Sequence, residues 1–113
     1  MSLVYDGRRF RPVGAVPDPS GAEPSVGHYH QSGDLVWAEF SGTAVRTGRL
    51  VGTCGPDGVL DAAYCYVTAA GETVSGTFTG TPTVLADGRI RLTEHWRRAD
   101  GSTGVSEIEE LSA

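Results

Sequence analysis

The sequence predicts an all-β protein, an antiparallel up-and-down (meander) β-barrel of about eight strands. Three observations favour this class. Sixteen of the 113 residues are glycine, short segments rich in Thr and Val alternate between apolar and polar residues, and compact turn sequences such as Ala-Asp-Gly separate these segments. The connections leave no room for a crossover helix, so we expect each strand to pair with the next.

Residues 85–110 specify the pairing of the last strands, because two Ala-Asp-Gly turns join three of them. In each turn Ala and Asp suit a type I turn, and Gly suits the left-handed position that follows. Counting outward from the turns predicts these pairs on one face: Phe78 with Trp96, Gly80 with Glu94, Trp96 with Gly104, Glu94 with Ser106, and Leu92 with Ile108. Period-two alternation places on the other, solvated face Thr77, Thr79, Arg91, Thr93, His95, Arg97 and Glu107.

The same turn signals divide the earlier part of the chain. We expect a first strand over residues 3–13, kinked at Asp6-Gly7 and ended by Pro12, and then a mobile loop over residues 14–25, rich in Pro, Gly and acidic residues. Further strands are expected at 26–31, 35–41, 44–54 and 73–83, with one more paired to 44–54 across residues 55–58. The predicted pairs of that hairpin are Gly48 with Tyr66, Leu50 with Tyr64, and Gly52 with Ala62. A glycine opposite an aromatic residue lets a strand coil while the ring covers the bare backbone.

Closure is the simplest way for such a meander to avoid two unpaired edges. An eight-stranded barrel has an interior that side chains fill or that holds one small ligand. The many glycines on the inner face favour a cavity. The alternative is that Trp96, Tyr64, Tyr66 and Phe78 fill the interior.

Composition limits the function classes. The length suits one domain over residues 1–113, and the net charge of −5 argues against a nucleic-acid partner. The basic residues other than His are all Arg, and the lack of Lys excludes Schiff-base chemistry and a phosphate-loop lysine. Because the sequence shows neither a membrane span nor a signal peptide, we expect no membrane partner and a cytoplasmic location.

The two cysteines are expected to be free thiols. The hairpin count places Cys54 opposite Leu60 and Cys65 opposite Arg49, on opposite faces of the sheet. That placement is beyond disulfide reach. We therefore interpret Cys54 as a small core residue rather than as a nucleophile.

Glu94 is the sharpest candidate for chemistry, because the predicted register puts its carboxylate on the apolar face. A buried carboxylate must be hydrogen-bonded, paired with a cation, or neutral through a raised pKa. The functional interpretation is a general base or an acceptor for a polar group of a ligand. The structural interpretation is an anchor that is bonded to Ser106, to a Tyr hydroxyl or to Arg98.

The aromatic residues are open to two interpretations. Tyr64 and Tyr66 either pack in the core with satisfied hydroxyls or present these hydroxyls to a ligand. Trp96 suits core packing. Trp37 is expected to face outward, because Val36, Ala38 and Phe40 form the more apolar side of its strand.

The remaining titratable residues give weaker signals. His28 and His30 share one strand face, but His95 has the wrong parity to complete a set of ligands, so no metal site is predicted. Glu107, Glu109 and Glu110 are expected to form a solvated strand end.

Several segments resemble a family of small bacterial proteins that are commonly labelled n-acetylglutamate synthase. The resemblance covers most of the chain, through YDGRRFRP, YHQSGDLV, FSG, GRLVG, DGRIRLTEHW and GVSEIEE. The label implies acetyl transfer, in which Arg/Gln-x-x-Gly-x-Gly/Ala at a helix start binds the acetyl-CoA pyrophosphate. Here the nearest match, Arg98-x-x-Gly101, ends in Thr103 within a predicted hairpin, so we do not expect acetyltransferase activity. The resemblance implies a compact lipocalin- or avidin-like barrel of unassigned function.

Together, these observations predict a protein that binds a small apolar or aromatic ligand inside its barrel, without a cofactor. The expected binding residues are Tyr64, Tyr66, Phe78, Glu94, Trp96 and Ser106. Two alternatives stay open. One is an isomerase or cyclase with Glu94 as its general acid or base; the other is a packed barrel that acts through subunit contacts, as a homo-oligomer would.

Overall fold

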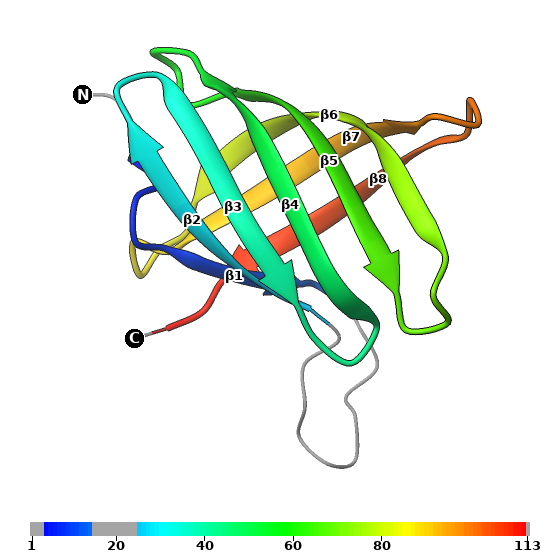
Figure 1. Ribbon diagram of the computed structural model, residues 1–113. Helices are drawn as coiled ribbons and strands as arrows, with labels where there is room; N and C mark the ends of the chain where they lie inside the picture. The colour runs from blue at the N-terminus through cyan, green and yellow to red at the C-terminus, as the bar shows by residue number, and fades with distance from the viewer. Residues whose placement is uncertain (1–3, 15–24, 113) are drawn as a thin grey trace.

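The computed structural model describes residues 4–14 and 25–112, and within these ranges the chain forms a closed antiparallel barrel (Figure 1). Each strand pairs with the next, and the last pairs with the first. The strands are β1 (Arg9–Pro12), β2 (Val26–Ser32), β3 (Leu35–Ser41), β4 (Val45–Cys54), β5 (Leu60–Thr68), β6 (Thr73–Val84), β7 (Ile90–Arg98) and β8 (Thr103–Glu110). The predicted eight-stranded meander barrel is therefore confirmed.

The strand register predicted from the two Ala-Asp-Gly turns is also confirmed. In each turn the residue before Ala donates its N–H to the carbonyl of the residue after Gly, at 2.7 and 2.8 Å. Gly88 and Gly101 take φ angles of 88° and 90°, the left-handed region that favours glycine. Glu94 consequently lies between Gly80 and Ser106 across the sheet, as the count predicted.

The first strand is shorter than expected. Gly7 has a φ of 79°, so the chain turns at Asp6-Gly7 and only Arg9–Pro12 joins the sheet. The residues before the turn run beneath the barrel, where the fully buried Tyr5 donates its hydroxyl hydrogen to the carbonyl of Gly58 at 2.6 Å. Most of the loop predicted to be mobile, residues 15–24, lies outside the described residues.

The barrel interior has a packed end and an open end. The packed end lies beneath the β2–β3, β4–β5 and β6–β7 turns (Figure 1). Its largest fully buried side chains are Tyr5, Phe10, Leu60, Ile90, Leu92 and Val36. The rings of Phe10 and Tyr29 meet edge to face at 4.8 Å between centroids and separate this core from the open end.

The two cysteines and Trp37 lie where the sequence predicted. Cys54 is buried opposite Leu60, Cys65 is exposed opposite Arg49, and both thiols are free. Trp37 is 40% exposed on the outer face.

One glycine contact differs from the expectation. Gly48 pairs with Tyr66 as predicted, but the ring that covers its backbone belongs to Phe40, its partner on β3. A Cβ at position 48 would fall on the Phe40 ring. Gly104 does follow the rule, because the ring of its partner Trp96 lies over it.

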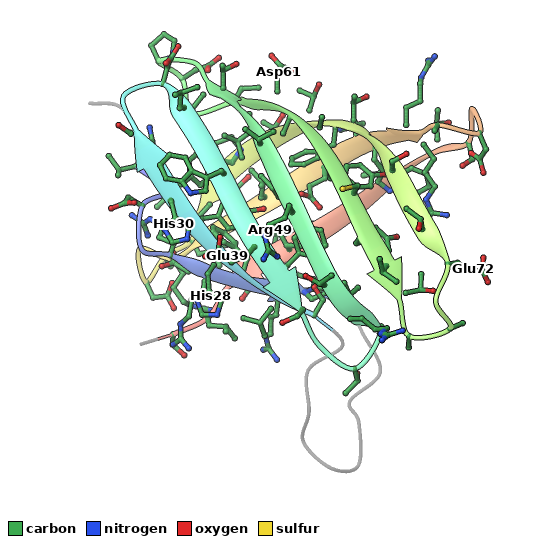
Figure 2. The ribbon with its side chains drawn as sticks, viewed as in Figure 1. His28, His30, Glu39, Arg49, Asp61 and Glu72 are labelled. Atoms are coloured by element: carbon green, nitrogen blue, oxygen red, sulfur yellow. The ribbon has the colours of Figure 1, made fainter. Side chains whose placement is uncertain are left out.

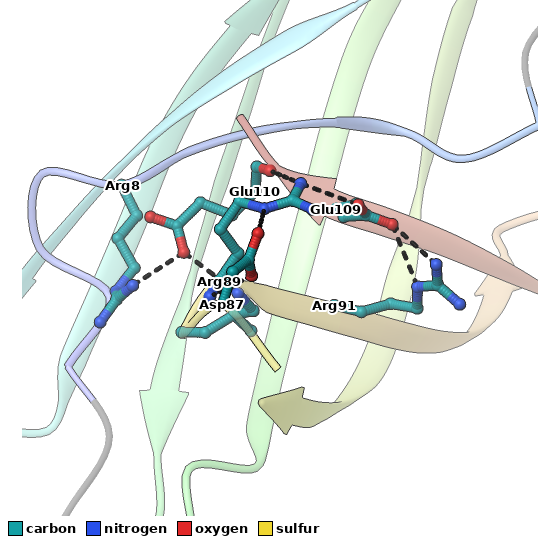
Figure 3. A network of polar contacts seen from close by, with 7 residues as sticks. Arg8, Asp87, Arg89, Arg91, Glu109 and Glu110 are labelled. Atoms are coloured by element: carbon teal, nitrogen blue, oxygen red, sulfur yellow. Dashed lines mark hydrogen bonds and ion pairs between the residues drawn. The ribbon is translucent and has the colours of Figure 1, made fainter. Parts of the chain in front are cut away.

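The expectation of a solvated acidic strand end is wrong for Glu109 and Glu110, whose side chains are 17% and 15% exposed. Glu110 accepts hydrogen bonds from Arg8 Nη1 at 2.7 Å and from the backbone N–H of Ile90 at 3.1 Å (Figure 3). Glu109 accepts from arginines on β7 and its preceding turn (Figure 3). These contacts tie β8 to β7 and to the segment before β1, at the seam that closes the barrel.

Within residues 4–14 and 25–112, no helix is both long and apolar enough to cross a membrane.

Candidate functional site

A cavity of about 470 Å³ lies at the open end of the barrel. Ligand pockets commonly measure about 300–1,000 Å³. The cavity is therefore large enough for a small molecule, and the alternative of an interior filled by aromatic side chains does not hold. The described residues that line it are Phe10, Pro12, Ser25, Gly27, Tyr29, Phe40, Ala44, Val45, Leu50, Tyr64, Tyr66, Phe78, Glu94, Trp96, Arg98, Val105, Ser106, Glu107 and Ile108.

All six residues that the sequence suggested as ligand contacts line this one cavity: Tyr64 and Tyr66 from β5, Phe78 from β6, Glu94 and Trp96 from β7, and Ser106 from β8. Their grouping follows from the confirmed register, because residues at spacing two share a face of the sheet. That they bind a ligand stays a prediction.

The sequence reasoning missed other parts of the wall. Phe40 covers one side of the cavity, and its place on the apolar side of β3 with Val36 and Ala38 was the signal that could have identified it. Tyr29 and Phe10 form the floor, where the chain before β1 packs against the barrel. That docking leaves no periodic pattern in the sequence.

Glu94 is a mostly buried carboxyl group without an internal partner. Among the described residues nothing donates a hydrogen bond to Glu94 or forms an ion pair with it, and the neighbouring Ser106 and Arg98 do not anchor it. Burial raises the pKa of Glu94 from its ordinary value of 4.5 to about 7. The structural interpretation required a hydrogen-bonded or paired anchor, which the described residues do not supply.

The charge of Glu94 affects the pKa of two tyrosines, Tyr29 and Tyr64. Burial is the main cause that raises the pKa of the fully buried Tyr29, and the negative charge of Glu94 raises it further. Burial also raises the pKa of Tyr64, the nearby Arg98 lowers it, and the negative charge of Glu94 adds to the rise. Glu94, Tyr29 and Tyr64 therefore interact electrostatically on the wall of one cavity.

Four aromatic rings from β3, β5 and β6 form a connected series on the cavity wall. The rings of Tyr64 and Tyr66 stack with centroids 6.1 Å apart, Tyr66 meets Phe40 edge to face at 5.9 Å, and Tyr64 lies 6.1 Å from Phe78. The tyrosine rings thus pack against each other and against the neighbouring phenylalanine rings on the cavity wall. Such a wall suits a flat or apolar guest.

Arg98 completes the wall at the mouth. Its guanidinium lies over the ring of Trp96, 4.9 Å from the centroid, and its Nη2 donates to the Tyr66 hydroxyl at 3.4 Å. The Nε atom is buried and finds no hydrogen-bond partner in the part of the chain that the structure describes.

His28 and His30 lie outside this site. Both belong to the outer face of β2, near Glu39 of β3 (Figure 2). His30 Nε2 is 2.5 Å from Glu39 Oε1, and the His30 ring stacks on Trp37 at 5.6 Å. Within residues 4–14 and 25–112, no three His, Cys, Asp or Glu side chains are grouped so that they could hold a metal ion.

The closed meander and its single-ended cavity define the class of small lipocalin- or avidin-like β-barrels. The model of one family, described as avidin-like protein, matches residues 3–111, and the chain belongs to this family. No curated protein and no solved structure gave a significant match. The family match does not address acetyl transfer.

Proposed function

We propose that this protein binds a small apolar or aromatic molecule in the barrel cavity. Tyr64, Tyr66, Phe78 and Trp96 would contact its body, while Glu94 and Ser106 would bind a polar group. The observation that carries the proposal is the unpartnered carboxyl of Glu94 on the wall of an otherwise mostly apolar cavity. Membership of the avidin-like family, whose barrels typically bind small ligands, supports it.

The ligand chemistry follows from the state of Glu94. With a pKa of about 7, this carboxyl is close to half ionised in neutral solution. The ionised form accepts hydrogen bonds, and the protonated form also donates one. A bound N–H or O–H group would give the buried charge the partner that the described residues do not provide.

The test is a thermal-shift screen with small aromatic and isoprenoid compounds. Ser106→Phe would place a ring in the cavity, and the matched control Ser75→Phe changes an exposed serine on the outer face of β6. At least one compound class should raise the Tm of the wild type and of the control but not of Ser106→Phe. Uniformly null shifts in the wild type would contradict the proposal.

A second candidate is an isomerase or cyclase, which the pKa of about 7 for Glu94 favours. A general acid or base works best when its pKa lies near the operating pH. Metabolite profiling with the wild type should then reveal a turnover that Glu94→Gln abolishes while the fold is retained. If Glu94→Gln changes only stability, this candidate fails.

Two predictions about the cellular form remain to be measured. Homo-oligomers are frequent in the avidin-like family, and light scattering would give the assembly of this chain. A cytoplasmic location likewise stays a prediction, which cell fractionation would test.

A further inference from the structure

We propose that the ligand carries an oxyanion, with a carboxylate as the simplest case, that binds Arg98 at the mouth of the cavity while the far end of the ligand reaches Glu94. This inference rests on the proposed function, and it specifies the polarity and orientation of the ligand.

The two charged residues lie along one line of the cavity wall. Glu94, Trp96 and Arg98 are alternate residues of β7 and all three line the cavity. At about 3.3 Å per residue, the Cα atoms of Glu94 and Arg98 are about 13 Å apart. A ligand that reaches both groups must therefore be elongated, with its apolar body passing the aromatic rings between them.

The guanidinium of Arg98 has unused hydrogen-bonding capacity. It carries five N–H donors, of which Nε–H is buried without a partner in the described chain, and its hydrogen bond to Tyr66 is long at 3.4 Å. A buried donor without a partner is unfavourable, and an incoming acceptor would relieve that cost.

No described carboxylate forms an ion pair with Arg98, and the nearby acidic residues are engaged elsewhere. Asp100 accepts hydrogen bonds from the N–H and hydroxyl of Ser102, at 2.9 and 2.6 Å. Glu107 also borders the cavity, and its Oε2 is 3.9 Å from Arg91 Nη1. The positive charge at the mouth is therefore available to a ligand.

Trp96 holds the guanidinium in place. A cation over an aromatic ring within about 6 Å of its centroid is attracted to the ring, and the distance here is 4.9 Å. The contact positions the guanidinium at the cavity wall. The paired N–H groups of a guanidinium match the two oxygens of a carboxylate.

The test compares 6-(4-hydroxyphenyl)hexanoate with 6-(4-hydroxyphenyl)hexanamide by isothermal titration calorimetry. The two probes share an alkyl chain and a phenol whose hydroxyl can donate to Glu94. They differ at the end of the chain, which is a charged carboxylate in one probe and a neutral amide in the other. The wild type should bind the carboxylate about tenfold more tightly than the amide, as expected for a charge-assisted hydrogen bond. Arg98→Gln should bring that ratio close to one.

Arg97→Gln is the matched control, because Arg97 is exposed on the outer face of the same strand and its loss changes net charge equally. This variant should keep the preference for the carboxylate. Equal affinity of the wild type for both probes, or equal effects of Arg98→Gln and Arg97→Gln, would overturn the role of Arg98 and leave cavity binding intact. If neither probe binds and the thermal-shift screen is also null, the proposed function itself fails.

Discussion

Replacing Glu94 by Gln should stabilise the protein at neutral and alkaline pH. Glutamine keeps the size of the side chain and removes the charge. In the wild type the ionised carboxyl lies mostly buried, without a hydrogen-bond or ion-pair partner among the described residues, and its pKa is raised from 4.5 to about 7. Because the substitution removes the ionised carboxyl, it removes the unfavourable free energy that corresponds to this rise in pKa.

The magnitude follows from the linkage between protonation and folding. One pKa unit corresponds to about 1.4 kcal/mol, so a rise from 4.5 to about 7 is worth about 3 kcal/mol. Between these pH values the folded protein binds more protons than the unfolded chain, so stability falls as pH rises. Below pH 4.5 both states are protonated and the penalty vanishes. Above pH 7 both are ionised and the penalty is complete.

The assay is urea unfolding of the wild type and Glu94→Gln between pH 4 and 8.5. The difference in free energy of unfolding should grow by about 3 kcal/mol in favour of Glu94→Gln across this range. Other groups with shifted pKa values, such as Glu39 and Asp87, contribute equally to both proteins and cancel in the difference. Glu72→Gln, in the exposed β5–β6 turn, is the control and should give a difference that does not vary in this way.

Parallel stability curves for the wild type and Glu94→Gln would refute the reasoning. They would mean that the carboxylate is solvated through the open mouth or has a partner that compensates its burial. A curve with the opposite slope would show that the ionised carboxylate is stabilised in the folded protein.

Three further predictions concern packing and closure. Gly52→Ala should lower the free energy of unfolding, measured by urea unfolding, by about 1–3 kcal/mol, because its Cβ would meet the backbone of β5. Gly80→Ala should cost less, because its Cβ would meet the Leu92 side chain at 3.1 Å and not the backbone. Glu110→Ala should lower the free energy of unfolding by about 1–3 kcal/mol and speed hydrogen exchange at the backbone N–H of Ile90, because this N–H loses the carboxylate to which it donates. Tyr5→Phe should lower stability by about 1 kcal/mol without changing ligand affinity, since its hydroxyl bonds to a turn at the packed end.

The sequence was sufficient to predict the register of β6, β7 and β8 because that register is set locally. An Ala-Asp-Gly turn determines which residues face each other across it, and period-two alternation carries the pairing along both strands. The positions of Glu94, Trp96 and Ser106 follow from this count alone.

The parts that the sequence could not predict depend on closure in three dimensions. Tyr5 fills the packed end although it lies outside any strand, and Glu110 meets Arg8 only because β8 returns to β1. Neither contact leaves a periodic signal in the chain. The cover of Gly48 by Phe40 is different, because the two residues pair across the β3–β4 hairpin and the apolar side of β3 was a signal for it.

The pH dependence of binding can show which form of Glu94 meets the ligand. If a ligand donates a hydrogen bond to the carboxylate, ionisation favours binding, so affinity should rise as pH passes through about 7. If a ligand only accepts, it selects the protonated carboxyl, and its affinity should fall over the same range. The phenol 6-(4-hydroxyphenyl)hexanoate and its methyl ether differ in this one donor, and both keep their own charge between about pH 5.5 and 8.5. If the affinities of the two probes change with pH in opposite directions, and both changes disappear in Glu94→Gln, this carboxyl is the group that binds the inner end of the ligand. If both affinities change with pH in the same way, the pH dependence belongs to another group.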